Sequence, residues 1–143
     1  MNENKVFLDT NILIYAYDAS AGQKNLKAKE ILVKLWNSKR GIISIQVMQE
    51  FFVNVTSKIQ YPIDTDSAEV IIKDLFQWEV VVNDEASVLK AIDIHIEHKF
   101  SFWDAMILQA AVHGRAKLLY TEDMTHGQEV QGVRIVNPFI REN

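Results

Sequence analysis

Short apolar runs alternate along the chain with longer stretches in which apolar residues recur every three or four positions. The short runs are rich in β-branched residues and predict five strands, at residues 6–8, 41–45, 79–82, 117–120 and 133–136. The longer stretches predict amphipathic helices that begin near residues 11, 22, 46, 64, 84 and 101. Strands that alternate with helices predict one α/β domain over residues 1–143, with a mostly parallel central sheet.

The first apolar run ends in an acid. Val6, Phe7 and Leu8 predict a buried central strand, and Asp9 follows them. In open parallel sheets, ligands bind at the carboxyl ends of the strands, so Asp9 is expected at a site of chemistry. The alternative is that Asp9 only caps the helix starting at Asn11, because aspartate is a favoured N-cap residue.

Three further acids are expected at the same edge of the sheet. Glu50 lies in the helix after the second strand, away from its apolar stripe, and Asp104 begins the helix that runs to residue 113. Asp123 follows the fourth strand, which repeats the pattern of a strand ending in a hydroxyl and an acid. Ordinary structural roles remain alternatives, since Glu50 also suits an early helical turn and the helix amino terminus would stabilise Asp104.

Composition narrows the chemistry. The 143 residues are 48% hydrophobic, which suits one domain with a substantial core. The absence of cysteine excludes disulfides, thiolate zinc sites and cysteine nucleophiles, and it fits a reducing cytoplasm. The first residues resemble neither a signal peptide nor a membrane span, so a soluble cytoplasmic protein is expected.

Charge bears on the ligand of the four acids. The formal net charge is −4, whereas nucleic-acid binders usually carry a basic patch. That objection weakens if the acids surround metal ions. Two unit charges about 4 Å apart repel by roughly 4 kcal/mol at an effective dielectric near 20, so four ionised carboxylates sharing one pocket require a cation. Oxygen ligands without His or Cys favour one or two Mg²⁺ or Mn²⁺ ions over zinc.

The acids and their contexts resemble the PIN-domain ribonucleases, most closely the VapC-type toxins of bacterial toxin–antitoxin pairs. The resemblance rests on DTN at residues 9–11, Glu50 in QEFF, Asp104 in SFWDAMI and Asp123 in LLYTEDM. Each motif is weak alone, but their order and their positions after the first, second and fourth strands are specific. The resemblance covers residues 5–138.

The resemblance implies a PIN-like three-layer α/β fold, in which helices flank a central parallel five-stranded sheet of order 3-2-1-4-5. That order places Asp9 and Asp123 side by side at the switch point of the sheet. Glu122 and His126 share the loop of Asp123 and either touch substrate or are ordinary surface residues. By the same resemblance, the acids that bind metal and carry catalysis are Asp9, Glu50, Asp104 and Asp123, and the supporting polar residues are Asn11, Ser44 and Thr121.

The implied activity is metal-dependent hydrolysis of RNA phosphodiester bonds, in which water attacks phosphorus and leaves a 5′-phosphate. The implied partners are an RNA substrate, a small antitoxin protein and a second copy of the chain in a homodimer. Two alternatives stay open. One is a non-catalytic protein-interaction module stabilised by a cation. The other is a haloacid-dehalogenase-like phosphatase, which needs a second acid two residues after Asp9, where this chain has Asn11.

Overall fold

One mixed sheet runs through the structure. The computed structural model describes residues 4–140, and its six strands pair in the order β3-β2-β1-β4-β6-β5. All neighbouring strands are parallel except β5 and β6. The strands are β1 (Val6–Leu8), β2 (Gly41–Ser44), β3 (Glu79–Val81), β4 (Leu118–Tyr120), β5 (Glu129–Val130) and β6 (Val133–Val136).

The edge strand β5 corrects the expectation of five parallel strands. The expected order 3-2-1-4-5 matches β3-β2-β1-β4-β6, and β5 is an additional antiparallel strand paired with β6. Val130 pairs with Val133, so Gln131 and Gly132 form a two-residue turn in which both φ angles are positive, at 48° and 87°. Such a turn matches the twist of a hairpin. A strand of two residues is too short to give an alternating pattern in the sequence.

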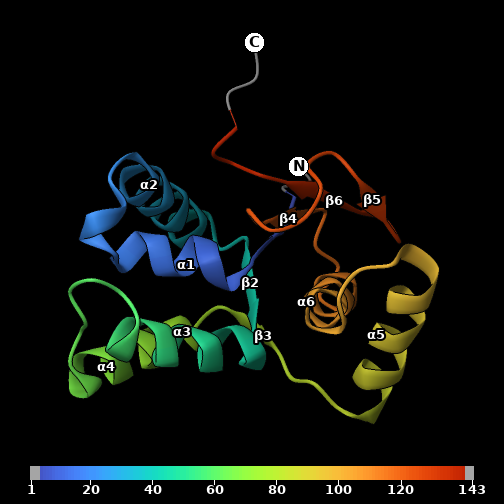
Figure 1. Ribbon diagram of the computed structural model, residues 1–143, viewed down its shortest axis with the longest axis horizontal. Coiled ribbons are helices and arrows are strands. Elements are labelled where there is room, and N and C mark those ends of the chain that lie inside the picture. The colour runs from blue at the N-terminus through green and yellow to red at the C-terminus, as the bar shows by residue number, and fades with distance from the viewer. Residues whose placement is uncertain (1–3, 141–143) are drawn as a thin grey trace.

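The helices lie on both sides of the sheet. In Figure 1, α1 to α4 lie to one side of β2 and β3, and α5 and α6 lie to the other. No helix described between residues 4 and 140 is long and apolar enough to cross a membrane. The helices are α1 (Thr10–Tyr17), the short 3₁₀ helix η1 (Ala19–Ala21), α2 (Gln23–Ser38), α3 (Ile45–Ser57), α4 (Thr65–Leu75), α5 (Glu85–His98) and α6 (Phe102–His113).

Several elements that carry the expected site are deeply buried. Every residue of β1 and β2 is buried, and α6 is buried along residues 105–111. Packing on all sides leaves these backbones little freedom to shift. Asp9, directly after β1, and Asp104, in the first turn of α6, therefore have well-fixed backbone positions.

The apolar residues of α5 do not all face the core. Ala91 and Ile94 are buried against the rest of the protein, while four larger apolar side chains of this helix lie at the surface. The sequence placed these residues on a helix, as observed, but periodicity alone does not say which apolar face is covered. The exposed residues are Val88, Leu89, Ile92 and Ile96.

Gly41 gives a test of the packing at the start of β2. A Cβ atom on Gly41 would lie 2.3 Å from Cζ3 of the Trp78 indole ring, far inside contact distance. We expect Gly41→Ala to lower the free energy of unfolding by about 1–3 kcal/mol, because the added methyl overlaps the Trp78 ring and forces that side chain to move. Urea denaturation followed by circular dichroism measures this change.

The control is the same substitution in a Trp78→Leu background. The indole Nε1 has no hydrogen-bond partner among the described residues, so replacing Trp78 removes ring volume without breaking such a bond. Gly41→Ala should cost less there than in the wild-type chain. An equal cost in both backgrounds would mean that the Trp78 ring is not the obstacle.

Candidate active site

The carboxyl ends of β1 and β4 bring two polar segments together. The strands pair in register, with Leu8 opposite Tyr120, and the next residues are Asp9 and Thr121. The backbone N–H of Asp9 donates to the Tyr120 carbonyl oxygen at 3.0 Å, which continues the pairing by one residue. Segments more than 100 residues apart in sequence thus meet at one edge of the sheet.

Asp9 is buried and doubly hydrogen-bonded. Its side chain is the N-cap of α1 and accepts from the Thr10 backbone N–H at 2.7 Å through Oδ1. Its Oδ2 accepts from the Thr121 hydroxyl at 2.8 Å. The helix begins at Thr10, one residue earlier than the sequence indicated. The capping role is therefore real, but it uses only one of the two carboxylate oxygens.

The electrostatic environment disfavours a negative charge on Asp9. Burial is the main cause and raises its pKa from 3.8 to about 7. Hydrogen bonds from Thr121 and Thr10 lower the pKa, while the nearby charges of Asp123 and Glu50 raise it further. Burial and repulsion raise the pKa by more than the two hydrogen bonds lower it. A cation would therefore stabilise the ionised form of Asp9.

Glu50 and Asp123 join Asp9 through the residues between them. The Thr10 hydroxyl donates to Glu50 Oε1 at 2.8 Å, so Thr10 links Glu50 to Asp9. On the other side, the Thr121 hydroxyl that donates to Asp9 accepts from the Asp123 backbone N–H at 3.1 Å. The structure thus brings together three of the four expected acids. It gives Thr10 a linking role that sequence reasoning missed, although Thr10 stands in the DTN motif.

The expected supporting residues differ in how directly they touch these acids. Thr121 is fully buried and contacts both Asp9 and Asp123. Asn11 donates from Nδ2 to Asp123 Oδ2 at 2.7 Å. The Ser44 hydroxyl accepts from the Val47 backbone N–H and caps α3, the helix that carries Glu50.

Asp104 lies beside this network rather than within it. Among the described residues, its side chain forms no hydrogen bond with the other three acids. Half-burial raises its pKa, hydrogen bonding by Ser101 opposes the rise, and the negative charge of Asp123 adds to it. Asp104 is therefore coupled to the site through space, mainly through Asp123.

Two loop residues that the sequence left open have partners within the protein. Glu122 accepts from the Tyr15 hydroxyl at 2.6 Å and forms an ion pair with Lys24. These contacts fix the residue next to Asp123. His126 accepts through Nδ1 from the Asn137 backbone N–H at 3.0 Å. The roles of Tyr15 and Lys24 had no local signal, since both lie more than 90 positions from Glu122.

The donor set suits a hard divalent cation. All four acids offer carboxylate oxygens, and such ligands favour Mg²⁺ or Mn²⁺. Within residues 4–140, however, no three acidic or histidine side chains are arranged as a ready-made metal cluster. Oxygens of Glu50, Asp9 and Asp123 instead accept hydrogen bonds from side chains of the protein. Metal binding would exchange some of these bonds for bonds to the ion.

Comparison with known proteins adds a family assignment. The model of the PIN domain family matches residues 6–126, a span that contains all four acids. No curated protein sequence matches the chain.

Solved structures of similar fold include toxins and toxin–antitoxin complexes. A toxin–antitoxin complex from Klebsiella pneumoniae is 21% identical, with 94% of this chain and 98% of that chain covered at a TM-score of 0.69. The sarcin–ricin loop cleaving toxin VapC20 from Mycobacterium tuberculosis is 17% identical, with 83% and 90% covered at 0.62. DNA-bound VapBC from Salmonella typhimurium is 19% identical, with 93% and 97% covered at 0.63. At identities this low, the structural likeness shows a shared fold and no more.

The raised pKa of Asp9 predicts a pH-dependent stability in EDTA. The folded state holds this proton more tightly than the unfolded state, so the free energy of unfolding falls as the pH rises from about 4 to about 7. The loss reaches at most about 4 kcal/mol. Asp9→Asn has no such proton, so its stability relative to wild type should increase over this pH range. Urea denaturation at a series of pH values measures the difference.

Asp93→Asn is the matched control, because Asp93 is an exposed acid on α5 and its replacement changes the net charge equally. It controls for the change in net charge, so the pH dependence that belongs to the buried carboxylate is the difference in stability between Asp9→Asn and Asp93→Asn. Adding Mg²⁺ at pH 8 should stabilise the wild-type chain more than Asp9→Asn. A flat difference between Asp9→Asn and wild type would contradict the electrostatic description of the site.

Proposed function

The chain belongs to the PIN domain family, and we propose that it is a divalent-metal-dependent endoribonuclease that acts as the toxin of a toxin–antitoxin pair. The observation that carries the proposal is the state of Asp9. Its carboxylate is buried at the carboxyl end of β1, close to the charges of Glu50 and Asp123, with a pKa near 7. A site that concentrates negative charge in this way favours a cation over a neutral or anionic ligand.

In this proposal the metal site consists of Asp9, Glu50, Asp104 and Asp123, with Mg²⁺ or Mn²⁺ as one or two ions. A bound ion would supply Lewis-acid chemistry, which makes water a better nucleophile and stabilises negative charge developing on the phosphodiester. The reaction is hydrolysis: water loses a proton and its oxygen bonds to phosphorus, while the bond from phosphorus to the 3′ oxygen breaks. The 3′ oxygen keeps the electron pair of that bond and takes up a proton, so the products are a 3′-hydroxyl and a 5′-phosphate. No side chain becomes covalently attached to the RNA.

The chain's own residues would hold the acids in place during the reaction. Thr121 contacts both Asp9 and the Asp123 backbone, and therefore ties the loop after β4 to the end of β1. Thr10 orients Glu50, and Asn11 orients Asp123. These three residues play positioning roles, because they act through the acids.

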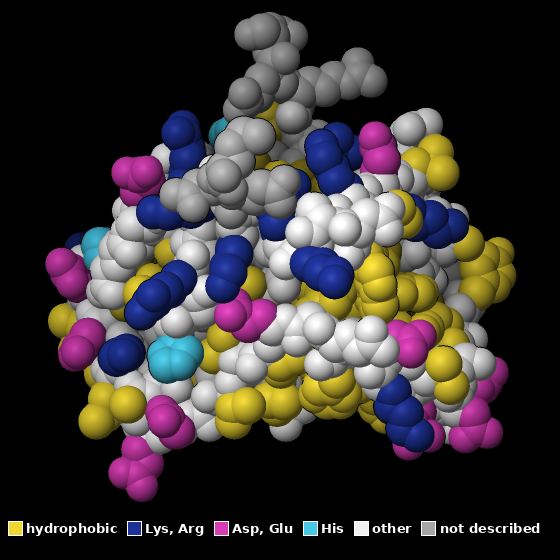
Figure 2. Space-filling model, turned by 180° about the vertical axis from the view of Figure 1, so that it is seen from behind, with side chains coloured by type: hydrophobic (Ala, Val, Ile, Leu, Met, Phe, Trp, Pro, Cys, Tyr) yellow, Lys and Arg dark blue, Asp and Glu magenta, His cyan; other side chains and the backbone are white. Residues whose placement is uncertain are grey.

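The negative net charge does not prevent RNA binding. On the face in Figure 2, Lys and Arg side chains gather over the centre and upper part, while most Asp and Glu side chains lie around the rim. The charge is thus unevenly distributed, and local potential governs where a polyanion associates. Similar structures include a toxin–antitoxin complex and a sarcin–ricin loop cleaving toxin, which supports an antitoxin and an RNA as partners here. A homodimer is part of the same proposal.

A second candidate is a protein-interaction module in which the acids only bind a structural cation. It is favoured by the hydrogen bonds that already satisfy Glu50, Asp9 and Asp123 within the chain. The phosphatase alternative is disfavoured, because Asn11 donates to Asp123 and carries no acid that could protonate a leaving group.

Cleavage of a mixed pool of structured RNAs tests the proposal. We expect the purified chain to cut RNA with Mg²⁺ or Mn²⁺ and not with EDTA, and to leave 5′-phosphate ends. Asp9→Asn and Asp123→Asn should each lower the cleavage rate by about 100-fold or more, since loss of even an outer-shell partner of a metal costs 10–100-fold. Gel electrophoresis and end-group analysis of the products provide the measurement.

Asp93→Asn again serves as the control and should cleave like wild type. Circular dichroism spectra of all variants should match, which separates loss of chemistry from loss of fold. If Mg²⁺ binds and stabilises the protein but no RNA in the pool is cut, the interaction module is the better assignment.

A further inference from the structure

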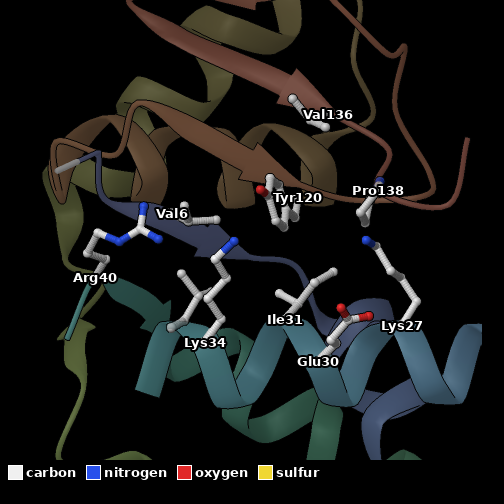
Figure 3. Close-up of a pocket in the computed structure, with 10 residues that line it drawn as sticks. Val6, Lys27, Glu30, Ile31, Lys34, Arg40, Tyr120, Val136 and Pro138 are labelled. Carbon is white, nitrogen blue, oxygen red and sulfur yellow. The ribbon is translucent and has the colours of Figure 1, made fainter. Parts of the chain in front are cut away.

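A cavity of about 250 Å³ lies between α2 and the strands β1, β4 and β6. Figure 3 shows the side chains of Lys27 and Lys34 reaching from α2 toward the strands, with Arg40 at the far end of the cavity. Apolar side chains, including Ile31 and the Tyr120 ring, form much of its wall. The cavity therefore combines a cationic rim with an apolar surface.

The cations outnumber the acids in this cavity. Lys27, Lys34 and Arg40 contribute three positive charges, and Glu30 contributes one negative charge. Among the described residues, Lys27 and Lys34 form no ion pair or hydrogen bond, although Glu30 lies within one helical turn of each. Arg40 is anchored, because its guanidinium donates to the Asn4 carbonyl oxygen. The ammonium groups of Lys27 and Lys34 are thus available to an anion.

The cavity adjoins the acidic site. Tyr120 lines the cavity, and its carbonyl oxygen accepts from the Asp9 N–H. On α2, Lys24 pairs with Glu122 in the loop of the acidic site, and Lys27 follows one turn later on the same face. From Lys24 to Lys34 the helix rises about 15 Å. A row of lysines therefore leads from the acidic site along the cavity.

We propose that this cavity binds a backbone phosphate of the RNA outside the bond that is cut, and this inference rests on the proposed ribonuclease function. Lys27 and Lys34 contact the phosphate, and the sugar or base packs against the apolar wall beside Tyr120. A nucleotide has both parts, an anionic group and a flat apolar one. The attraction between the RNA and these lysines also offsets the repulsion between the RNA and the acids, because the lysines lie next to the acidic site.

RNA binding by a catalytically inactive chain provides the test. In the Asp9→Asn background, Lys27→Gln/Lys34→Gln is compared with Lys29→Gln/Lys90→Gln, which removes two exposed lysines outside the cavity. The probe is a fluorescein-labelled single-stranded RNA of mixed sequence, measured by anisotropy in EDTA over 50–200 mM salt. The cavity variant should bind about 10-fold or more weakly. Its slope of log K against log salt should fall by about 0.7, since one phosphate contact to a single strand contributes about 0.7.

The control variant should bind the RNA like its parent, and both variants should show the parent's thermal unfolding. In the active background, Lys27→Gln/Lys34→Gln should raise KM for RNA cleavage. Equal RNA affinity of the two double variants, or no binding by the parent, would overturn the inference. So would a cavity variant that keeps its RNA affinity but loses binding to a polyglutamate peptide, because the cavity would then recognise an acidic protein segment. Failure of the proposed function gives a separate result, which is the absence of metal-dependent cleavage by wild type.

Discussion

The cost of burying the Asp9 carboxylate is the constraint on which the site depends. A carboxylate removed from water must be hydrogen-bonded, neutralised or paired with a positive charge. Thr10 and Thr121 supply two hydrogen bonds, yet the pKa stays near 7, so these bonds offset only part of the cost. The rest must come from a proton or a cation. This need explains why polar residues 112 positions apart converge on one strand end.

The four acids differ in how firmly the fold holds them. Asp9 follows a fully buried strand, and Asp104 begins a helix that is buried along most of its length, so the core sets both backbones. Glu50 and Asp123 are exposed, and a side-chain hydrogen bond from Thr10 or Asn11 orients each carboxylate. Each of these hydrogen bonds to a charged group contributes about 1.5–3 kcal/mol, which a bond from the same oxygen to a ligand can replace. In the site, Asp9 and Asp104 therefore have fixed positions, whereas the side chains of Glu50 and Asp123 can turn toward a ligand at low cost in free energy.

Most of the fold could be predicted from the sequence, because the two central strands, β1 and β4, are short apolar runs followed by an acid or a hydroxyl residue. The runs before Asp9 and Thr121 predicted the two central strands, and the resemblance to PIN domains supplied their adjacency. The two-residue strand β5 could not be read, since its pairing depends on a turn at Gln131 and Gly132. Three features of the site could not be predicted either. They are the hydrogen bond from Thr10 to Glu50, the ion pair of Lys24 with Glu122, and the separation of Asp104 from the hydrogen-bonded network. Each depends on how side chains from distant segments meet, which periodicity does not encode.

The same limit applies to charge. Summed over the sequence, the charge is −4 and argues against a nucleic-acid ligand. In the folded chain, the acids of the site lie at the carboxyl edge of the sheet, and Lys27 and Lys34 face a cavity beside it. Lys24, one turn away, is already neutralised by Glu122. Lys27 and Lys34 are seven positions apart, so the sequence places them on one face of a helix. Only the packing of α2 against the strands turns that face into one side of a cavity. Association with a polyanion depends on this local arrangement, because screening in physiological salt limits each charge to a range of about 8 Å.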